Sequence, residues 1–329
     1  MNSFGTIFRV SIFGESHGIQ IGAVIDGCPA GIALAEDDLA EDFERRKAGG
    51  RGSTPRIEPD LPRIVSGVYR GMTTGAPVTI VFENTNIKSK DYDNLLYHPR
   101  PGHADFTSQK KYGGFSDPRG GGHFSGRITL GLVAAGVIAK KILSPATVEA
   151  VLLEAGGLKD IEKAVENALE EKDSIGGLIE CTVRDLPSGL GEPFFNSVES
   201  VIAHMIFAVP ATRGIEFGSG FASARMKGSE HNDNILASDG TTESNFASGI
   251  NGGISNGNEI VFRVPVKPTS SIGKPQNTYN FKEDKIEELL IEGRHDSCIA
   301  LRIPVVIESA AAIALADLLL LEQRRPRVF

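Results

Sequence analysis

Basic residues are concentrated in one short segment of this chain, residues 45–56. Five of them occur there with no acidic residue between them: Arg45, Arg46, Lys47, Arg51 and Arg56. An arginine side chain presents a rigid, permanently charged fork that matches a carboxylate or a phosphate. Gly49, Gly50 and Gly52 lie among these residues and would let the main chain approach such an anion. The segment is therefore either a solvated loop, as most charge runs are, or a clamp for an anionic ligand.

Histidines form a second group of candidate functional residues. Five of the seven lie beside Gly, Pro, Asp or Arg in segments expected to be loops: His17, His98, His103, His123 and His295. A histidine titrates near neutral pH, which suits general acid–base catalysis. One loop histidine is usually incidental, but several in Gly-rich polar loops favour a catalytic site. A metal site is not expected, because the chain has no HxH or HxxxH pair.

A third candidate is the glycine-rich run at residues 119–127, which reads RGGGHFSGR and precedes an expected helix. A Gly-rich turn at the N-terminus of a helix can bind an anion. The run is not a Walker loop, since no Gly-Lys-Ser/Thr follows, and it is not a dinucleotide turn, since no clear strand precedes it. Together, the three groups suit a small polyanionic substrate and a phosphate-bearing cofactor.

The composition indicates a protein with one large core, because 40% of its 329 residues are hydrophobic. The net charge of −8 argues against a general nucleic-acid binder and against a membrane-surface protein. Charge-free apolar stretches such as residues 128–139 are shorter than the roughly 20 residues that span a bilayer. Charged residues interrupt the N-terminal apolar stretch, so no signal peptide is expected. The three cysteines form no CxxC pair, and we expect a reduced, cytoplasmic protein without metal.

Local patterns predict both strands and helices. Runs of β-branched residues bounded by glycine predict strands at residues 7–13, 22–26, 63–68, 77–83 and 177–183. Periodic apolar residues predict a helix starting near Ala35 and helices at residues 128–143, 161–172, 198–207 and 305–325. Residues 84–127 show little periodicity, and a loop-rich stretch of that length inside a compact domain is usually functional.

Two of the expected helices resemble each other. Arg127-Ile128 followed by Ala135, Ile138, Ala139 and Leu143 aligns without gaps on Arg302-Ile303 followed by Ala310, Ile313, Ala314 and Leu318. Alanine-rich helices align easily by chance, so the sequence leaves open whether the chain is duplicated. A duplication would predict two similar halves with these helices packed together in the middle. No linker divides the chain, and we expect residues 1–329 to form a single catalytic domain.

Seven short motifs occur in a fixed order along the chain. They are FGESHG (13–18), RR (45–46), RPGHAD (100–105), RGGG (119–122), GGISNG (252–257), KPT (267–269) and GRHD (293–296). In this order the motifs resemble those of the chorismate synthase family, from near the N-terminus to the last helix. Each motif alone is modest, whereas seven in order are highly specific.

The resemblance implies an α+β fold with internal duplication, in which two antiparallel sheets sandwich central long helices, assembled as a homotetramer. It implies a lyase that converts 5-enolpyruvylshikimate 3-phosphate to chorismate and phosphate by anti-1,4-elimination. The implied cofactor is reduced FMN, needed although the reaction has no net redox change, with NADPH as a candidate reductant of the flavin. No metal, nucleic acid or membrane is implied.

The resemblance also assigns residues. His17 matches the acid that protonates the leaving phosphate, His103 the histidine that keeps reduced flavin correctly protonated, and Asp296 the carboxylate that relays the substrate C6 proton. The flavin contacts map onto His123, Phe124, Ser125, Ala211, Gly252, Lys267, Pro268, Thr269, Ser270, Ser271 and Arg294. The anionic substrate would be bound by Arg46, Arg51, Arg100, Arg127 and Arg294. Arg46 and Arg51 also match the family's NADP-linked positions.

The chain departs from the family pattern in places. Residues 123–128 read HFSGRI where the family commonly reads Arg-Ser-Ser-Ala-Arg-Glu, so the flavin contact there is made either by the His123 side chain or by the main chain alone. Pro210 replaces a common Asn, and the chain is short between residues 143 and 176. Two rival functions remain: a flavin enzyme with net redox chemistry driven by NADPH, and a non-catalytic binder of phosphorylated metabolites or RNA.

Overall fold

The first half of the fold is a five-stranded antiparallel sheet covered by helix α3. The computed structural model describes residues 1–48, 50–54, 58–85, 95–291 and 295–324. The sheet order is β1 (Ser3–Phe4), β2 (Arg9–Gly14), β3 (Gln20–Asp26), β7 (Val78–Glu83) and β4 (Arg63–Ser66). Helix α3 (Thr129–Leu143) packs on β2, β3 and β7. A Cβ atom on its Gly131 would come within 3.0 Å of the Gly22 carbonyl oxygen, so this helix lies very close to β3.

The second half repeats this plan with a four-stranded antiparallel sheet and helix α7 (Pro304–Gln323). The sheet order is β10 (Glu216–Phe217), β13 (Ile260–Val266), β9 (Gly177–Arg184) and β8 (Thr147–Ala155). Buried and less buried side chains alternate along β9 and β13, as expected when one face of a sheet is covered. Helix α7 packs against β8 and β9.

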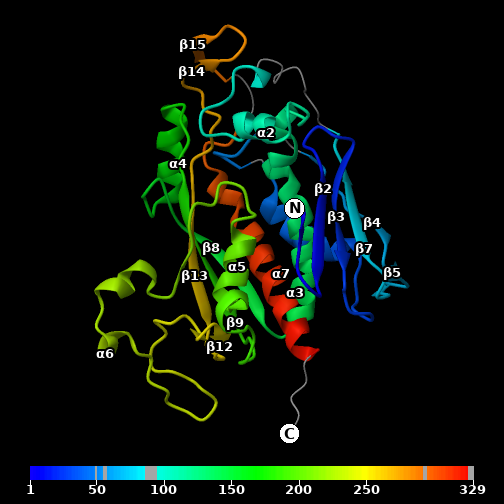
Figure 1. The fold of residues 1–329 in the computed structure, drawn as a ribbon, viewed down its shortest axis with the longest axis vertical. Helices are drawn as coiled ribbons and strands as arrows, with labels where there is room; N and C mark the ends of the chain where they lie inside the picture. The colour runs from blue at the N-terminus through cyan, green and yellow to red at the C-terminus, as the bar shows by residue number, and fades with distance from the viewer. Residues whose placement is uncertain (49, 55–57, 86–94, 292–294, 325–329) are drawn as a thin grey trace.

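Helices α3 and α7 lie side by side between the two sheets (Figure 1). They approach closely because Gly136 has no side chain: a Cβ atom there would lie 2.3 Å from Ser309 Cβ and 2.6 Å from Ser309 Cα. Both helices are buried almost all round. Helix α7 is long and apolar enough to cross a membrane. However, 83% of its apolar segment is buried inside the protein, as in the core helix of a folded domain.

Two buried acids on α7 tie this helix to its surroundings. Asp317 accepts hydrogen bonds from the backbone N–H groups of Thr6, Ile7 and Phe8, at 2.7–2.9 Å. Glu308 is 1% exposed and accepts from the Ala150 N–H of β8 at 2.8 Å. Arg45 and Lys140 supply positive charge to Glu308 and hold its pKa below the usual value despite burial. Because both carboxylates have hydrogen-bond partners, Asp317 and Glu308 can be buried. Together they connect the N-terminal segment and both halves of the fold to α7.

Shorter elements surround this core. The remaining helices are α1 (Ala40–Arg46), α2 (Asp105–Lys111), α4 (Ile161–Glu170), α5 (Val198–Ile206) and α6 (Gly228–His231). Two-stranded ribbons pair β5 (Val68–Tyr69) with β6 (Met72–Thr73), β11 (Ile250–Asn251) with β12 (Ile254–Ser255), and β14 (Gln276–Asn280) with β15 (Lys285–Leu289). The 3₁₀ turns that matter for the site are η3 (Arg119–Phe124), η4 (Gly126–Ile128) and η7 (Ile299–Arg302).

The α+β architecture expected from the sequence is confirmed, with two antiparallel sheets and two long central helices. The patterns were wrong or silent in several places, three of them in the core or near the site. The helix expected from Ala35 begins as a 3₁₀ turn and becomes α-helical at Ala40. The stretch expected to be loop contains α2, whose polar sequence has no apolar periodicity. Strand β8 was not predicted, because TVEAVLLEA suits a helix as well as a strand.

The contact at Gly136 yields a stability prediction. Gly136→Ala places a methyl group where the main chain of Ser309 lies, so the two helices must separate. We expect a loss of about 1–3 kcal/mol, typical of an overpacked core, measured as a lower urea midpoint. Gly228→Ala is the control, since a Cβ there meets nothing within 4 Å. Equal midpoints for the two variants would show that the helices do not depend on this contact.

Candidate active site

A cavity of about 790 Å³ lies where the turns that precede α3 and α7 meet. Turn η4 leads into α3 and carries Arg127, and turn η7 leads into α7 and carries Arg302. The C-terminal end of α5 forms another part of the wall, through Met205 and the following Ala208. The cavity is therefore built where the two halves of the fold join.

The cavity collects residues from motifs that are far apart in sequence. The predicted residues that line it are Arg46, Arg100, His103, His123, Phe124, Ser125, Arg127, Ala211, Lys267, Pro268, Thr269, Ser270, Ser271 and Asp296. These residues come from loops that flank both sheets, and the sequence alone did not indicate which loops would meet.

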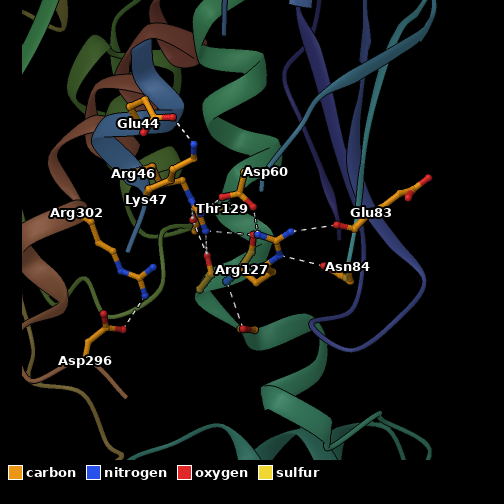
Figure 2. A network of polar contacts seen from close by, with 12 residues as sticks. Glu44, Arg46, Lys47, Asp60, Glu83, Asn84, Arg127, Thr129, Asp296 and Arg302 are labelled. Atoms are coloured by element: carbon orange, nitrogen blue, oxygen red, sulfur yellow. Dashed lines mark hydrogen bonds and ion pairs between the residues drawn. The ribbon is translucent and has the colours of Figure 1, made fainter. Parts of the chain in front are cut away.

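Arg46 and Arg127 share one buried carboxylate, Asp60 (Figure 2). Arg127 forms a short ion pair with Asp60 and donates from Nε to Asn84 Oδ1 at 3.0 Å. Arg46 Nη1 lies 3.5 Å from Asp60 Oδ2. Arg46 also donates from Nη2 to the Gly126 carbonyl at 2.8 Å and from Nε to Thr129 Oγ1 at 3.1 Å. Through these bonds Arg46, at the end of α1, holds the turn that precedes α3.

Asp296 forms the second arginine–carboxylate pair at the cavity. Arg302 Nη2 donates to Asp296 Oδ2 at 2.7 Å, as Figure 2 shows, and the Thr54 N–H donates to Oδ1 at 3.0 Å. The Asp296 carbonyl also accepts from Thr269 Oγ1 at 2.6 Å. The predicted base is therefore fixed from both sides, with the KPT loop bonded to its main chain.

The lining of the cavity carries an excess of positive charge. Among the described residues, six Lys and Arg side chains and three carboxylates line it, a surplus of three positive charges. Burial and the charges of Arg302 and Arg127 lower the pKa of Arg46 to about 9, against the opposing effect of Asp60 and Asp296. Bound anions would relieve this repulsion, so the site is suited to a ligand with several negative charges.

His103 lies in a compact polar cluster at one side of the cavity. Its Nδ1 atom is 2.6 Å from Asp105 Oδ1, and Arg100 donates from Nε to Asp105 Oδ2 at 2.7 Å. Arg100 also donates to Ser271 Oγ at 3.0 Å, which joins the RPGHAD motif to the loop at residues 267–271. Lys267 Nζ strengthens this junction by donating to the Gly102 carbonyl at 2.6 Å.

His17 lies behind the glycine-rich turn. It is 5% exposed and does not line the cavity itself, but a Cβ atom on Gly120, which does, would lie 2.7 Å from His17 Nε2. Gly120, Gly121 and Gly122 have φ values of 60°, 80° and 54°, a left-handed conformation that other residues rarely adopt. The three glycines therefore allow this turn to pass directly over the histidine.

His123 turns its ring toward the protein. Its Nδ1 atom is 2.7 Å from the Gly14 carbonyl, and its Nε2 atom is 3.3 Å from Asn2 Oδ1. A carbonyl oxygen only accepts hydrogen bonds, so Nδ1 carries a proton. Ser125 Oγ is also engaged, because it accepts from the Arg127 N–H at 3.3 Å. These bonds engage both ring nitrogens of His123, while residues 123–125, including Phe124, still line the cavity.

Two predicted residues in the described part of the chain lie away from the cavity, and a third falls outside that part. Arg51 is on the surface, where its side chain is 70% exposed and pairs with Glu166 at 2.8 Å. Gly252 lies in the turn between β11 and β12, at the end of α5 opposite the cavity, where the neighbouring Gly253 carbonyl accepts from the Val198 N–H. Arg294 falls outside the described residues, as does Arg56.

The structure adds site residues that the sequence analysis missed. Arg302 and Asp60 line the cavity, and so does His295, which the sequence indicated only as one of several candidate loop histidines. Arg302 could have been found, since it occupies the same place as Arg127 in the internal repeat. Asp60 had no such signal. Burial lowers the pKa of His295, and Arg100 adds to the shift while Asp296 opposes it, so the surroundings favour the neutral ring.

Comparisons with known proteins agree with this geometry. The family model described as chorismate synthase matches residues 8–320. The chain belongs to the chorismate synthase family. It is 62% identical to the chorismate synthase of Chitinophaga pinensis over 100% of this chain and 99% of that protein, and 44% identical to that of Dehalococcoides mccartyi over 99% of each.

A solved structure titled "Crystal Structure of Chorismate Synthase" resembles the fold with a TM-score of 0.74 and 25% identity, covering 97% of this chain and 93% of that one. Sequence and fold comparisons thus agree over nearly the whole chain. They assign it the chorismate synthase function, the last step of the shikimate pathway.

The pair formed by Arg302 and Asp296 yields a binding prediction. Arg302→Gln removes one of the six positive charges on the described cavity lining, and a hydrogen bond to a charged group contributes about 1.5–3 kcal/mol. We therefore expect inorganic phosphate to bind roughly 10- to 100-fold more weakly, measured by titration calorimetry. The control is Arg263→Gln, because Arg263 pairs with Glu180 outside the cavity. Equal phosphate affinity in both variants would remove Arg302 from the anion site.

Proposed function

We propose that this protein converts 5-enolpyruvylshikimate 3-phosphate to chorismate and phosphate by anti-1,4-elimination, with reduced FMN in the same cavity. The observation that carries the proposal is the surplus of three positive charges on the described cavity lining, beside four histidines and a fixed carboxylate. The substrate has two carboxylates and a phosphate, and FMN adds another phosphate. So much like charge needs cationic partners in a site shielded from water.

The residues present fit a flavin. The cavity lies within the 300–1,000 Å³ range typical of cofactor and ligand sites. Phe124, Leu132 and Met205 give it apolar wall, while Lys267 and the hydroxyl groups of residues 269–271 offer polar contacts. These groups would hold the ring system and the phosphate chain, together with Ala211 and the main chain of residues 123–125. Bound reduced FMN would supply an electron-rich ring whose N5 atom can accept the C6 proton.

The chain's own residues perform the remaining tasks in this proposal. Arg46, Arg100 and Arg127 neutralise the substrate anions. His17 gives a proton to the phosphate oxygen as the C–O bond breaks, since the leaving group gains charge at that moment. His103 keeps the reduced flavin in its reactive protonation state. Asp296, held by Arg302 and the Thr54 N–H, relays the proton that leaves C6.

A cytoplasmic homotetramer is part of the proposal. Phe194 and Phe195 are 86% and 92% exposed, which is costly on a monomer and supports a subunit contact. Gly252 lies at the far end of α5 from the cavity of its own chain, so a flavin contact there would have to involve a neighbouring subunit's site. Light scattering during size-exclusion chromatography tests the assembly, and a monomer at working concentration would contradict it.

The reaction is tested by an anaerobic assay. Purified protein, substrate and photoreduced FMN should release phosphate and form chorismate in equal amounts, and oxidised FMN should support neither. A second reaction with FMN and NADPH tests whether NADPH reduces the bound flavin. This test is motivated by Arg46 and the exposed Arg51, which match the family's NADP-linked positions. Phosphate binding without turnover would favour the rival function, a non-catalytic binder of phosphorylated metabolites.

Catalytic variants give the next prediction. His17→Ala and Asp296→Asn each remove a group that moves a proton, so turnover should fall about 100-fold or more while FMN and substrate still bind. Single-turnover phosphate release separates this loss from weaker binding. His204→Ala is the control, because His204 lines the same cavity but has no assigned proton transfer. Wild-type turnover in either variant across pH 6–8 would remove that residue from the mechanism.

The position of His123 yields a prediction about pH. Because its ring is bonded to Gly14 and Asn2, we propose that only the main chain here contacts FMN. FMN affinity at pH 6 and pH 8 should then change in the same way in wild type and in His123→Arg. If only the arginine variant retained its affinity at pH 8, the His123 side chain would be a titratable substitute for the family arginine.

A further inference from the structure

The cluster around His103 contains a carboxylate with no role assigned so far, Asp105. It is the first residue of α2 and its side chain is 9% exposed. Arg100 and His103 line the cavity, whereas Asp105 lies behind them and does not. Any effect of Asp105 on the reaction must therefore pass through one of these two neighbours.

Both oxygens of Asp105 are fully engaged. Oδ2 accepts from the Arg100 N–H at 3.1 Å and from Arg100 Nε at 2.7 Å. Oδ1 accepts from Arg100 Nη2 at 2.8 Å and lies 2.6 Å from His103 Nδ1. Burial opposes ionisation of this group, but the bonds to Arg100 and His103 together hold its pKa well below the usual range. Asp105 is thus a carboxylate at any working pH and can only accept hydrogen bonds.

This geometry decides which ring nitrogen of His103 carries the proton. Two groups compete for Nδ1, since Arg100 Nη2 is 3.0 Å away and the Asp105 carboxylate is 2.6 Å away. An unprotonated Nδ1 would face a carboxylate oxygen lone pair at 2.6 Å, which is repulsive. A protonated Nδ1 donates to that oxygen, while Arg100 Nη2 is already used on the same carboxylate. The short contact therefore favours the form with the proton on Nδ1.

The other nitrogen, Nε2, is then the unprotonated atom of the neutral ring. It points toward the glycine-rich turn, where a Cβ atom on Gly121 would lie 3.5 Å from it and 3.4 Å from Cε1. A side chain at residue 121 would therefore be in van der Waals contact with this edge of the ring. With Nδ1 committed to Asp105, proton uptake and release by His103 are restricted to Nε2.

We propose that Asp105 is a positioning residue that fixes the Nδ1–H tautomer of His103 and leaves Nε2 as the atom that exchanges a proton at the active site. The role of His103 in turnover rests on the proposed function, whereas its tautomer does not. Asp105 also orients the Arg100 guanidinium through two bonds, so one carboxylate aligns an acid–base group and an anion-binding group. A wrong tautomer at such a site can cost up to about 10⁴-fold in turnover.

The test compares wild type with Asp105→Asn. In perdeuterated, histidine-labelled protein, the ring ¹⁵N and ¹³Cδ2 shifts of His103 report its tautomer, and their loss in His103→Gln assigns them. We expect the Nδ1–H form in wild type and a mixture or the Nε2–H form in Asp105→Asn, because an amide can either accept from or donate to Nδ1. Asp233→Asn is the control: Asp233 also accepts main-chain bonds but does not line the cavity.

Turnover is the second readout. In Asp105→Asn we expect kcat to fall about 100-fold or more while FMN still binds, and in Asp233→Asn we expect no change. The Nε2–H form in wild type would overturn the proposal, and this result needs no variant to fold. A changed tautomer with unchanged kcat would overturn it as well. Absence of turnover in wild type would count against the proposed function alone, since the tautomer can be measured without it.

Discussion

The close contact between α3 and α7 is the constraint on which the site depends. Because Gly136 leaves room for the main chain of Ser309, the two helices lie side by side. As a result, the turns that precede them, η4 and η7, meet at the cavity. Arg127 and Arg302 occupy equivalent positions before these helices, and each reaches the cavity with a carboxylate partner. An internally repeated fold thus builds one site from two similar arginine–carboxylate pairs.

Electrostatics then limits what the cavity can bind. Two buried pairs would nearly cancel, and Arg46, Arg100 and two lysines add positive charge to the described lining. Asp105 and Glu44, behind the lining, pair with Arg100 and Lys47, so the positive charge that remains is centred on Arg46 and Lys267. Burying such charge is costly, and breaking any one pair leaves an uncompensated ion. Two features offset this cost. Asp60 forms ion pairs with both Arg46 and Arg127, and the buried acids of α7, Glu308 and Asp317, connect the two halves of the fold. A polyanionic ligand, such as the proposed substrate, would complete the balance.

Much of this could be predicted from the sequence, for identifiable reasons. Strands such as β3 and helices such as α3 follow from local apolar patterns, and seven ordered motifs indicated the family. Long-range pairing was less accessible. Nothing near Asp60 indicates that it would meet Arg46 and Arg127, and a charge run does not reveal that Arg46 would be 4% exposed while Arg51 remains on the surface. Strand β8 was missed because its residues suit either structure, and packing against α7 decides it.

A crystal structure of the protein with oxidised FMN and substrate would test the proposed site most directly. The account predicts both molecules in the cavity between the turns that precede α3 and α7. Their carboxylate and phosphate oxygens should lie within hydrogen-bond distance of Arg46, Arg127 and Arg302, with the flavin against the main chain of residues 123–125. Ligands bound elsewhere, or anionic groups that contact none of these three arginines, would contradict it.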